Sequence, residues 1–191
     1  WSGFSYVNPT VVDNAAASLS PQVLKGQLIK RNALEHDYVP FFGSSEWSRF
    51  DPFHPSVLAA KYKRSYRPFL LGARGSQSLT HFFVMQSVNP QLKNKKAVVF
   101  VSPQWFTPKG EDPNAFSFYY STLQTTNWIK QQNGSKMDRY AAYRLLQMPS
   151  GNSDKVIAGA LARIAAGLKP TTSQMLYVNL RNRILLNEDQ I

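Results

Sequence analysis

The sequence has 191 residues, 43% of them hydrophobic and none of them cysteine, with a formal net charge of +11. This length and composition suit one ordinary domain or a large part of a bigger one. They exclude wholesale disorder, a disulfide scaffold, cysteine-ligated zinc and a thiol nucleophile.

The basic charge is concentrated in one window of the sequence. Between Asp51 and Glu111 there is no acidic residue, whereas the same window contains Lys61, Lys63, Arg64, Arg67, Arg74, Lys93, Lys95, Lys96 and Lys109. A surface of one charge sign attracts polyanions such as nucleic acid, anionic lipid headgroups and phosphate-rich wall polymers. The alternative interpretation is a solvated surface that only keeps the protein soluble.

The sequence pattern of residues 1–36 predicts an N-terminal entry segment followed by a helix. Residues 1–19 show little periodicity, and the stretch from Pro21 to Leu34 is typical of a short amphipathic helix. No run in the sequence approaches the roughly 18 consecutive apolar residues of a membrane span.

Residues 37–112 predict a parallel α/β core. Apolar runs at residues 38–42, 66–71 and 97–101 predict three strands, and residues 55–63 and 76–87 predict the helices between them. The third run is continuous and β-branched, so we expect a strand buried on both faces. The alternation of strands and helices favours a parallel sheet covered by helices on both sides.

Residues 113–191 predict a helical block. Helices are expected over residues 114–130, 138–147, 154–168 and 173–186. Three parallel strands are fewer than the roughly five or six of a usual doubly wound sheet. We therefore expect this chain to be part of a larger α/β fold.

The common motifs that would assign a function directly are missing from the sequence. It contains no Walker loop, no Rossmann glycine fingerprint and no G-x-S-x-G elbow, and nothing in it indicates an organic cofactor. The histidines His36, His54 and His81 lie far apart without metal-ligand spacing, so we interpret each as structural and expect no metal. His54 has the strongest claim of the three to a functional role.

Small and polar residues follow all three predicted strands, in the loops Gly43–Ser45, Gly72–Gln77 and Ser102–Gln104. Ligands of an open parallel sheet bind beyond the carboxyl ends of its strands. A serine between strand and helix, an unobstructed glycine N–H and a side-chain amide together suit an oxyanion. A simple helix-capping turn is the alternative interpretation of the first loop.

Three strings in this region resemble those of the DltD family, the D-alanyl–lipoteichoic acid biosynthesis proteins of Gram-positive bacteria. They are FGSSEWSRFDPFHP (residues 42–55), YRPFLLG (66–72) and SPQWF (102–106). The resemblance covers about residues 37–130. It implies an SGNH-hydrolase-like, flavodoxin-like three-layer α/β/α fold with a parallel sheet, incomplete in this chain. It also implies a place at the extracellular face of the cell membrane, with an N-terminal anchoring helix outside this sequence.

The resemblance further implies the residues of a catalytic site. Ser45 aligns with the nucleophile of the SGNH superfamily, and Ser44 stands where that superfamily has an aspartate. The oxyanion hole would comprise the N–H of Ser45, the N–H of Gly75, for which Gly72 is the second choice, and the side chain of Gln104. Gln104 replaces the usual asparagine.

The general base is the part of the site that we expect outside the chain. The superfamily draws the base and its orienting carboxylate from an Asp-x-x-His block near the C-terminus, which we expect beyond Ile191. His54 with Asp51 is the alternative within the chain. Further candidates for substrate binding are Ser44, Glu46, His54, Arg67, Arg74 and Trp105.

The leading functional hypothesis is an acyl-transfer protein of the cell envelope that acts on D-alanyl esters. Its expected partners are polyglycerol-phosphate lipoteichoic acid, the membrane surface, a membrane acyltransferase and a D-alanyl carrier protein. Because the base is expected elsewhere, we expect this chain to be inactive by itself. The alternative is a non-catalytic module that binds polyanions or docks a carrier protein. Nucleic acid is the least favoured partner, since no nucleic-acid motif accompanies the charge.

Overall fold

The computed structural model describes residues 7–189, which form a mixed α/β structure around a small parallel sheet. The sheet comprises β1 (Tyr38–Gly43), β2 (Arg67–Gly72) and β3 (Val98–Val99), in the order β2-β1-β3. Both neighbouring pairs are parallel, and Gly43 lies opposite Gly72 at the carboxyl ends of β1 and β2. The predicted parallel α/β fold is confirmed, and because both pairs are parallel, the loops that follow the strands all leave from one edge of the sheet.

The prediction that the third strand is buried was wrong. Among residues 7–189, β3 is an edge strand that pairs only with β1, and Val98 and Val99 are 38% and 46% exposed. The backbone of Phe100 continues the pairing by donating to the carbonyl of Phe42 at 2.7 Å. A β-branched run is typical of a strand that is covered on both faces. Among residues 7–189, β3 pairs with a strand on one side and leaves its side chains exposed.

The two faces of the sheet bury side chains against different elements. Phe42, Phe69 and Leu71 pack into a core with residues of α1 (Pro9–Ala16), α2 (Pro21–Lys25), α3 (Leu28–Glu35) and α5 (Ser78–Ser87). Phe41 and Leu70 point to the opposite face, as the alternation of side chains along a strand requires. There they contact Trp47 of the 3-10 helix η1 (Ser45–Ser48), which directly follows β1.

The N-terminal region has more helix than predicted. Residues 9–16, where no helix was expected, form α1, whose N-terminus is capped by the Asn8 side chain and has Pro9 in its first turn. The single helix predicted from Pro21 to Leu34 is divided into α2 and α3. Asp189 accepts hydrogen bonds from the backbone N–H groups of Gln27 and Leu28, at 2.8 and 2.9 Å, and so caps α3.

Short helices connect the strands. Between β1 and β2 lies α4 (Pro55–Lys61), with proline at its first position as predicted, and α5 and α6 (Asn89–Leu92) lie between β2 and β3. The 3-10 helix η2 (Pro103–Trp105) follows β3 and leads into the loop that ends at Glu111.

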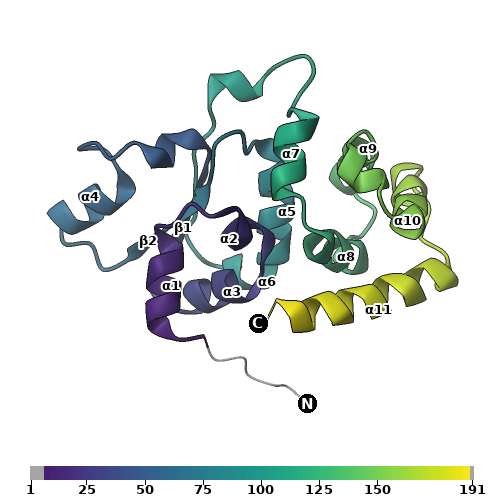
Figure 1. Ribbon diagram of the computed structural model, residues 1–191, viewed down its shortest axis with the longest axis horizontal. Coiled ribbons are helices and arrows are strands. Elements are labelled where there is room, and N and C mark those ends of the chain that lie inside the picture. Colours follow the sequence, from purple (N-terminus) through teal and green to yellow (C-terminus); the bar gives the residue numbers. More distant parts are fainter. Residues whose placement is uncertain (1–6, 190–191) are drawn as a thin grey trace.

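The C-terminal residues form a block of helices. They are α7 (Pro113–Tyr119), α8 (Thr122–Gln131), α9 (Lys136–Leu146), α10 (Lys155–Ala165) and α11 (Thr172–Glu188), with the 3-10 helix η3 (Pro149–Asn152) before α10. The helix predicted over residues 114–130 is two helices, because Ser121 caps a new helix at α8. Trp128 and Ile157 form the core of this block together with Phe83 of α5, so α5 joins the sheet to the helices (Figure 1).

Within residues 7–189, no helix has both the length and the apolar character needed to cross a bilayer.

Candidate functional site

Ser45 and Gln104 line one cavity at the carboxyl edge of the sheet. Ser45 begins η1 directly after β1, and Gln104 lies in η2 just after β3. The cavity has a volume of about 300 Å³, and its other lining residues are Glu46, Arg49 and the segment from Phe100 to Pro103. Since β1 and β3 are adjacent and parallel, the loops that follow them meet, as was predicted from their positions after strands.

The two glycines of the second loop are placed differently. Gly72 lies so close to β1 that a Cβ there would overlap the carbonyl of Gly43 and lie 2.8 Å from Trp47 Cδ1. Gly75 has a φ of +87°, which favours glycine, and its Cα faces Ala115 of α7. Gly75 is not among the residues that line the cavity of Ser45 and Gln104. The second loop therefore contributes to the site through Gly72, whose lack of a side chain lets the end of β2 lie directly against Gly43 and Trp47.

Hydrogen bonds fix the first loop on the second. The carbonyl of Gly43 accepts from Ser76 Oγ at 3.0 Å, and Ser44 Oγ donates to the carbonyl of Ala73 at 3.2 Å. The backbone N–H of Ser44 donates to Glu46 Oε1 at 2.6 Å. Ser44 and Glu46, both predicted to bind substrate, thus hold the backbone on either side of Ser45.

His81 links all three loops, a role that its sequence context did not reveal. It lies on α5 and is 2% exposed, and its Nε2 donates to the carbonyl of Gly43 at 2.5 Å. Its ring stacks on Trp105, the residue after Gln104, at 5.5 Å between centroids. Burial lowers the pKa of His81 to about 4, against the raising effect of the hydrogen bond to Gly43, so the ring is neutral at pH 7. A neutral ring with its proton on Nε2 leaves Nδ1 unprotonated, in agreement with the lack of a hydrogen-bond partner for Nδ1 among residues 7–189.

Glu111 positions the helix that carries His81. The N-terminus of α5 has no side-chain cap of its own, and Gln77 and Thr80 instead donate backbone N–H groups to the Glu111 carboxylate at 3.2 and 3.1 Å. The hydroxyl of Thr80 adds a third hydrogen bond at 2.5 Å. Burial raises the pKa of Glu111, while these hydrogen bonds act in the opposite direction. Sequence reasoning missed this residue because the cap is supplied from 31 positions away.

His54 is not placed to act as the base for Ser45. The string Asp51-Pro52-Phe53-His54 does have the Asp-x-x-His spacing, but the Asp51 carboxylate accepts from the N–H of Phe53 at 2.7 Å. His54 Nδ1 accepts from the N–H of Ser56, so its proton lies on Nε2, which donates to the carbonyl of Trp47 at 3.3 Å. Both ring nitrogens are therefore occupied in capping α4 and holding η1.

The other two histidines in residues 7–189 are also hydrogen-bonded to groups other than Ser45. His81 is bonded to Gly43, and His36 Nδ1 is bonded to the carbonyl of Asn32 at the end of α3. The hydroxyl of Ser45 itself has no hydrogen bond to a described residue. Among residues 7–189, no group of three or more His, Cys, Asp or Glu side chains is placed to hold a metal ion.

The two predicted arginines lie at different places. Arg67 begins β2, about 17 Å along the strand from Gly72, and it forms ion pairs with Asp13 and Asp37 at 2.6 and 2.8 Å. Arg67, a predicted candidate for substrate binding, therefore lies at the opposite end of β2 from the glycine loop. Arg74 does lie in that loop and is exposed, and its carbonyl accepts from Tyr119 at 2.6 Å. Arg49, which was not singled out from the sequence, lines the cavity and is exposed.

Comparison with known proteins identifies relatives over nearly the whole chain. The family profile described as DltD protein matches residues 16–191. Protein DltD of Lacticaseibacillus rhamnosus is 46% identical over 200 aligned residues, which cover 98% of this chain and 47% of the relative. Protein DltD of Staphylococcus aureus (strain NCTC 8325 / PS 47) is 39% identical, over 75% of this chain and 37% of the relative. Protein DltD of Bacillus subtilis (strain 168) is 33% identical, over 80% of this chain and 40% of the relative.

The chain thus spans less than half the length of these relatives. The profile match extends well beyond the three strings that first suggested the resemblance, and it includes all the helices from α2 onward. This chain belongs to the DltD family.

Proposed function

We propose that this protein acts in the D-alanylation of lipoteichoic acid at the outer face of the cell membrane, as an acyl-transfer protein with Ser45 as its nucleophile. The observation that carries the proposal is the cavity that Ser45 shares with Gln104 at the carboxyl edge of a parallel sheet. Membership of the DltD family supports the choice of pathway.

The proposed reaction is a transfer through a seryl ester. Ser45 Oγ attacks the carbonyl carbon of a D-alanyl ester or thioester, and its proton passes to a general base supplied from outside residues 7–189. The bond between the carbonyl carbon and the donor oxygen or sulfur then breaks, and the donor leaves as an alcohol or thiol. A glycerol hydroxyl of the polymer attacks the seryl ester in turn and releases Ser45.

The groups around Ser45 have distinct roles in this proposal. The N–H of Ser45 and the side-chain amide of Gln104 stabilise the oxyanion of the tetrahedral intermediate. The N–H of Gly75 is a candidate third donor only if its loop moves, because Gly75 does not line the cavity. Arg49, which lines the cavity, and Arg74, which lies exposed in the second loop, would attract the phosphates of the polymer.

The donor is proposed to reach the site from the membrane side. A membrane acyltransferase and a D-alanyl carrier protein are the candidate donors, and the basic residues between Asp51 and Glu111 would favour the anionic headgroups of the membrane. No metal or organic cofactor takes part in the proposed reaction, since a serine nucleophile and oxyanion donors suffice for acyl transfer.

Covalent labelling tests the proposal. The full-length protein would be treated with a fluorophosphonate and, separately, with a D-alanyl thioester, and the labelled residue would be located by mass spectrometry. We expect label on Ser45, loss of label in Ser45→Ala, and retention of label in Ser48→Ala, which alters the other serine hydroxyl of η1. Equal labelling of Ser45→Ala and the parent protein would contradict the proposal.

A non-catalytic polyanion-binding module is the second candidate function. It is favoured by the Ser45 hydroxyl, to which no histidine among residues 7–189 is hydrogen-bonded, and by the exposure of Arg49 and Arg74. This function predicts salt-dependent binding of lipoteichoic acid that Ser45→Ala leaves unchanged and Arg49→Glu weakens. Duplex DNA serves as the control polyanion, and equal binding of DNA would indicate general charge attraction.

A further inference from the structure

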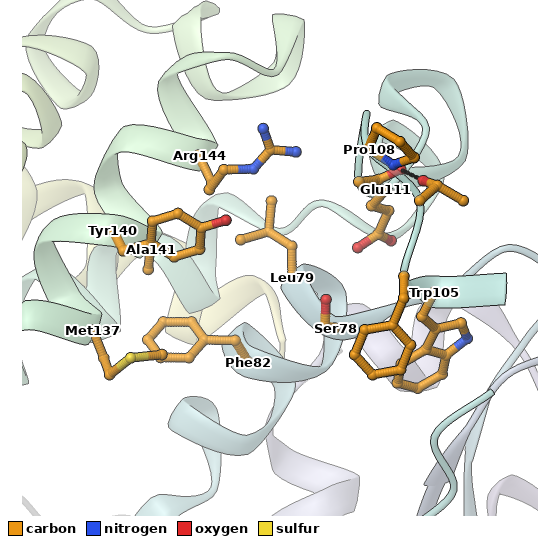
Figure 2. A pocket seen from close by; sticks show the side chains of 13 residues that line it. Ser78, Leu79, Phe82, Trp105, Pro108, Glu111, Met137, Tyr140, Ala141 and Arg144 are labelled. Carbon is orange, nitrogen blue, oxygen red and sulfur yellow. Dashed lines mark hydrogen bonds between the residues drawn. The ribbon is translucent and has the colours of Figure 1, made fainter. Parts of the chain in front are cut away.

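A second cavity lies between α5 and α9, apart from the cavity of Ser45. Its volume is about 370 Å³, near the lower end of the roughly 300–1,000 Å³ of small-molecule sites. Figure 2 shows Leu79 and Phe82 of α5 facing Met137, Tyr140 and Ala141 of α9 across this space, with the loop from Trp105 to Glu111 on the third side. The cavity is therefore built from the sheet-covering helix α5 and the helical block together.

We propose that this cavity binds the alkyl chain of a single-chain anionic amphiphile whose head group lies on Arg144. The proposal does not depend on the acyl-transfer function. It assigns one shared ligand chemistry, an alkyl chain that ends in a phosphate or a carboxylate.

The side chain of Arg144 supplies the recognition of the anion. It is the one cationic side chain that lines the cavity, it is half-buried, and it forms no ion pair with any residue between 7 and 189. Its present hydrogen bonds go to neutral oxygens, the carbonyl of Lys109 at 3.3 Å and the side chain of Gln147. A guanidinium group is suited to bidentate contact with a carboxylate or phosphate and can exchange these neutral partners for an anion.

Glu111 fixes the direction in which such a ligand lies. Its carboxylate lines the cavity and is already occupied by the N–H groups of Gln77 and Thr80 and the hydroxyl of Thr80. An anionic head near Glu111 would be repelled, whereas one near Arg144 would be attracted. The head therefore belongs at Arg144, with the chain over Leu79 and Phe82.

The rim of the cavity is unusually apolar for a surface. Phe106, Met137 and Tyr140 line the cavity and are 78%, 63% and 59% exposed. A chain longer than the cavity can continue over these side chains and remove them from water. A flexible alkyl chain can adapt its shape to these exposed apolar side chains. Met137 can adapt in turn, because the methionine side chain is flexible.

Calorimetry with four matched probes tests the proposal on the 191-residue chain. The probes are decyl phosphate, decanoate, decanol and decyltrimethylammonium, each below its micelle-forming concentration. We expect saturable one-to-one binding of the two anions. The alcohol and the cation should bind more weakly than the anions, by a factor of about ten or more. Tighter binding of decyl phosphate than of decanoate would point to a lipid phosphate as the source, and the reverse to a fatty acid.

Variants on α9 separate the proposed site from general attraction to a basic protein. Arg144→Gln should weaken binding of both anions about tenfold and leave decanol unchanged, whereas Arg139→Gln on the same helix, which does not line this cavity, should leave all four probes unchanged. Met137→Asp changes an exposed side chain at the rim and should weaken every anionic probe. Absence of saturable binding, or equal losses in Arg144→Gln and Arg139→Gln for variants whose circular dichroism matches the parent, would overturn the proposal.

Discussion

The imidazole of His81 donates from Nε2 to the carbonyl oxygen of Gly43, at 2.5 Å and across 38 positions of sequence. This hydrogen bond joins the helix after the second loop to the last residue of β1, directly before the loop that carries Ser45. The same ring stacks on Trp105, which follows the third strand. One buried side chain therefore connects the loops that follow all three strands.

Replacing His81 by phenylalanine tests this role. His81→Phe keeps an aromatic ring against Trp105 but removes the donor to Gly43, so we expect a loss of about 1–3 kcal/mol in the free energy of unfolding. Urea denaturation measures the change. His36→Phe, which alters an exposed histidine at the end of α3, should stay within about 0.5 kcal/mol of the parent protein, and equal effects of the two substitutions would contradict the assignment.

The depressed pKa of His81 predicts that stability falls in mild acid. The unfolded histidine titrates near its ordinary pKa of 6.5 and the folded one near 4, so the unfolded state binds more protons between these values. The contribution of His81 is complete above about pH 6.5 and is lost as the pH falls towards 4, which amounts to about 2 kcal/mol between pH 7 and pH 5.

The carboxylates of the protein also titrate in this range, so the comparison needs His81→Phe as its reference. The free energy of unfolding of the parent protein should fall by about 2 kcal/mol more than that of His81→Phe between pH 7 and pH 5. Parallel pH profiles for the two proteins would show that His81 does not titrate with a lowered pKa.

Gly72 should tolerate no side chain. In Gly72→Ala the new Cβ meets the carbonyl of Gly43, which the strand pairing prevents from moving, so we expect destabilisation of at least about 1–3 kcal/mol. Gly159→Ala is the matched control, because Gly159 lies within α10 and its Cβ would meet only the flexible side-chain amide of Gln174 at 2.9 Å. Thermal melts should show a lowered Tm for Gly72→Ala and an unchanged or raised Tm for Gly159→Ala.

The 191-residue chain should show no steady-state turnover of a D-alanyl ester. A serine hydroxyl is a weak nucleophile at neutral pH without a base in hydrogen-bond reach, and both ring nitrogens of His54 are occupied elsewhere. Ester hydrolysis followed by release of D-alanine should therefore be the same for the parent chain, Ser45→Ala and His54→Ala. Turnover that both substitutions abolish would place the base at His54 after all.

The sequence was sufficient to predict the parts of the fold that depend on local patterns. β1 and β2 follow from apolar runs that end in glycine, and the meeting of Ser45 with Gln104 follows from their positions after parallel strands. The exposure of β3 could not be predicted, because burial depends on which neighbours a strand has rather than on its own residues.

Residues that act over long sequence distances also escaped prediction. His81 and Glu111 contact groups 38 and 31 positions away, and neither belongs to a recognisable motif. The distance of Arg67 from the glycine loop has a simpler reason. Arg67 lies at the start of a strand whose end carries the glycine loop, so a short separation in sequence becomes the full length of an extended strand.

The cap that Asp189 provides for α3 has a consequence for the order of folding. Because the capping carboxylate lies 162 positions after Gln27, the first turn of α3 is complete only when the last helix has docked. A ribosome-bound chain would lack this cap on α3 until the 162 positions from Gln27 to Asp189 had emerged. Completion of α3 in the helical layer against the sheet is therefore coupled to the docking of α11.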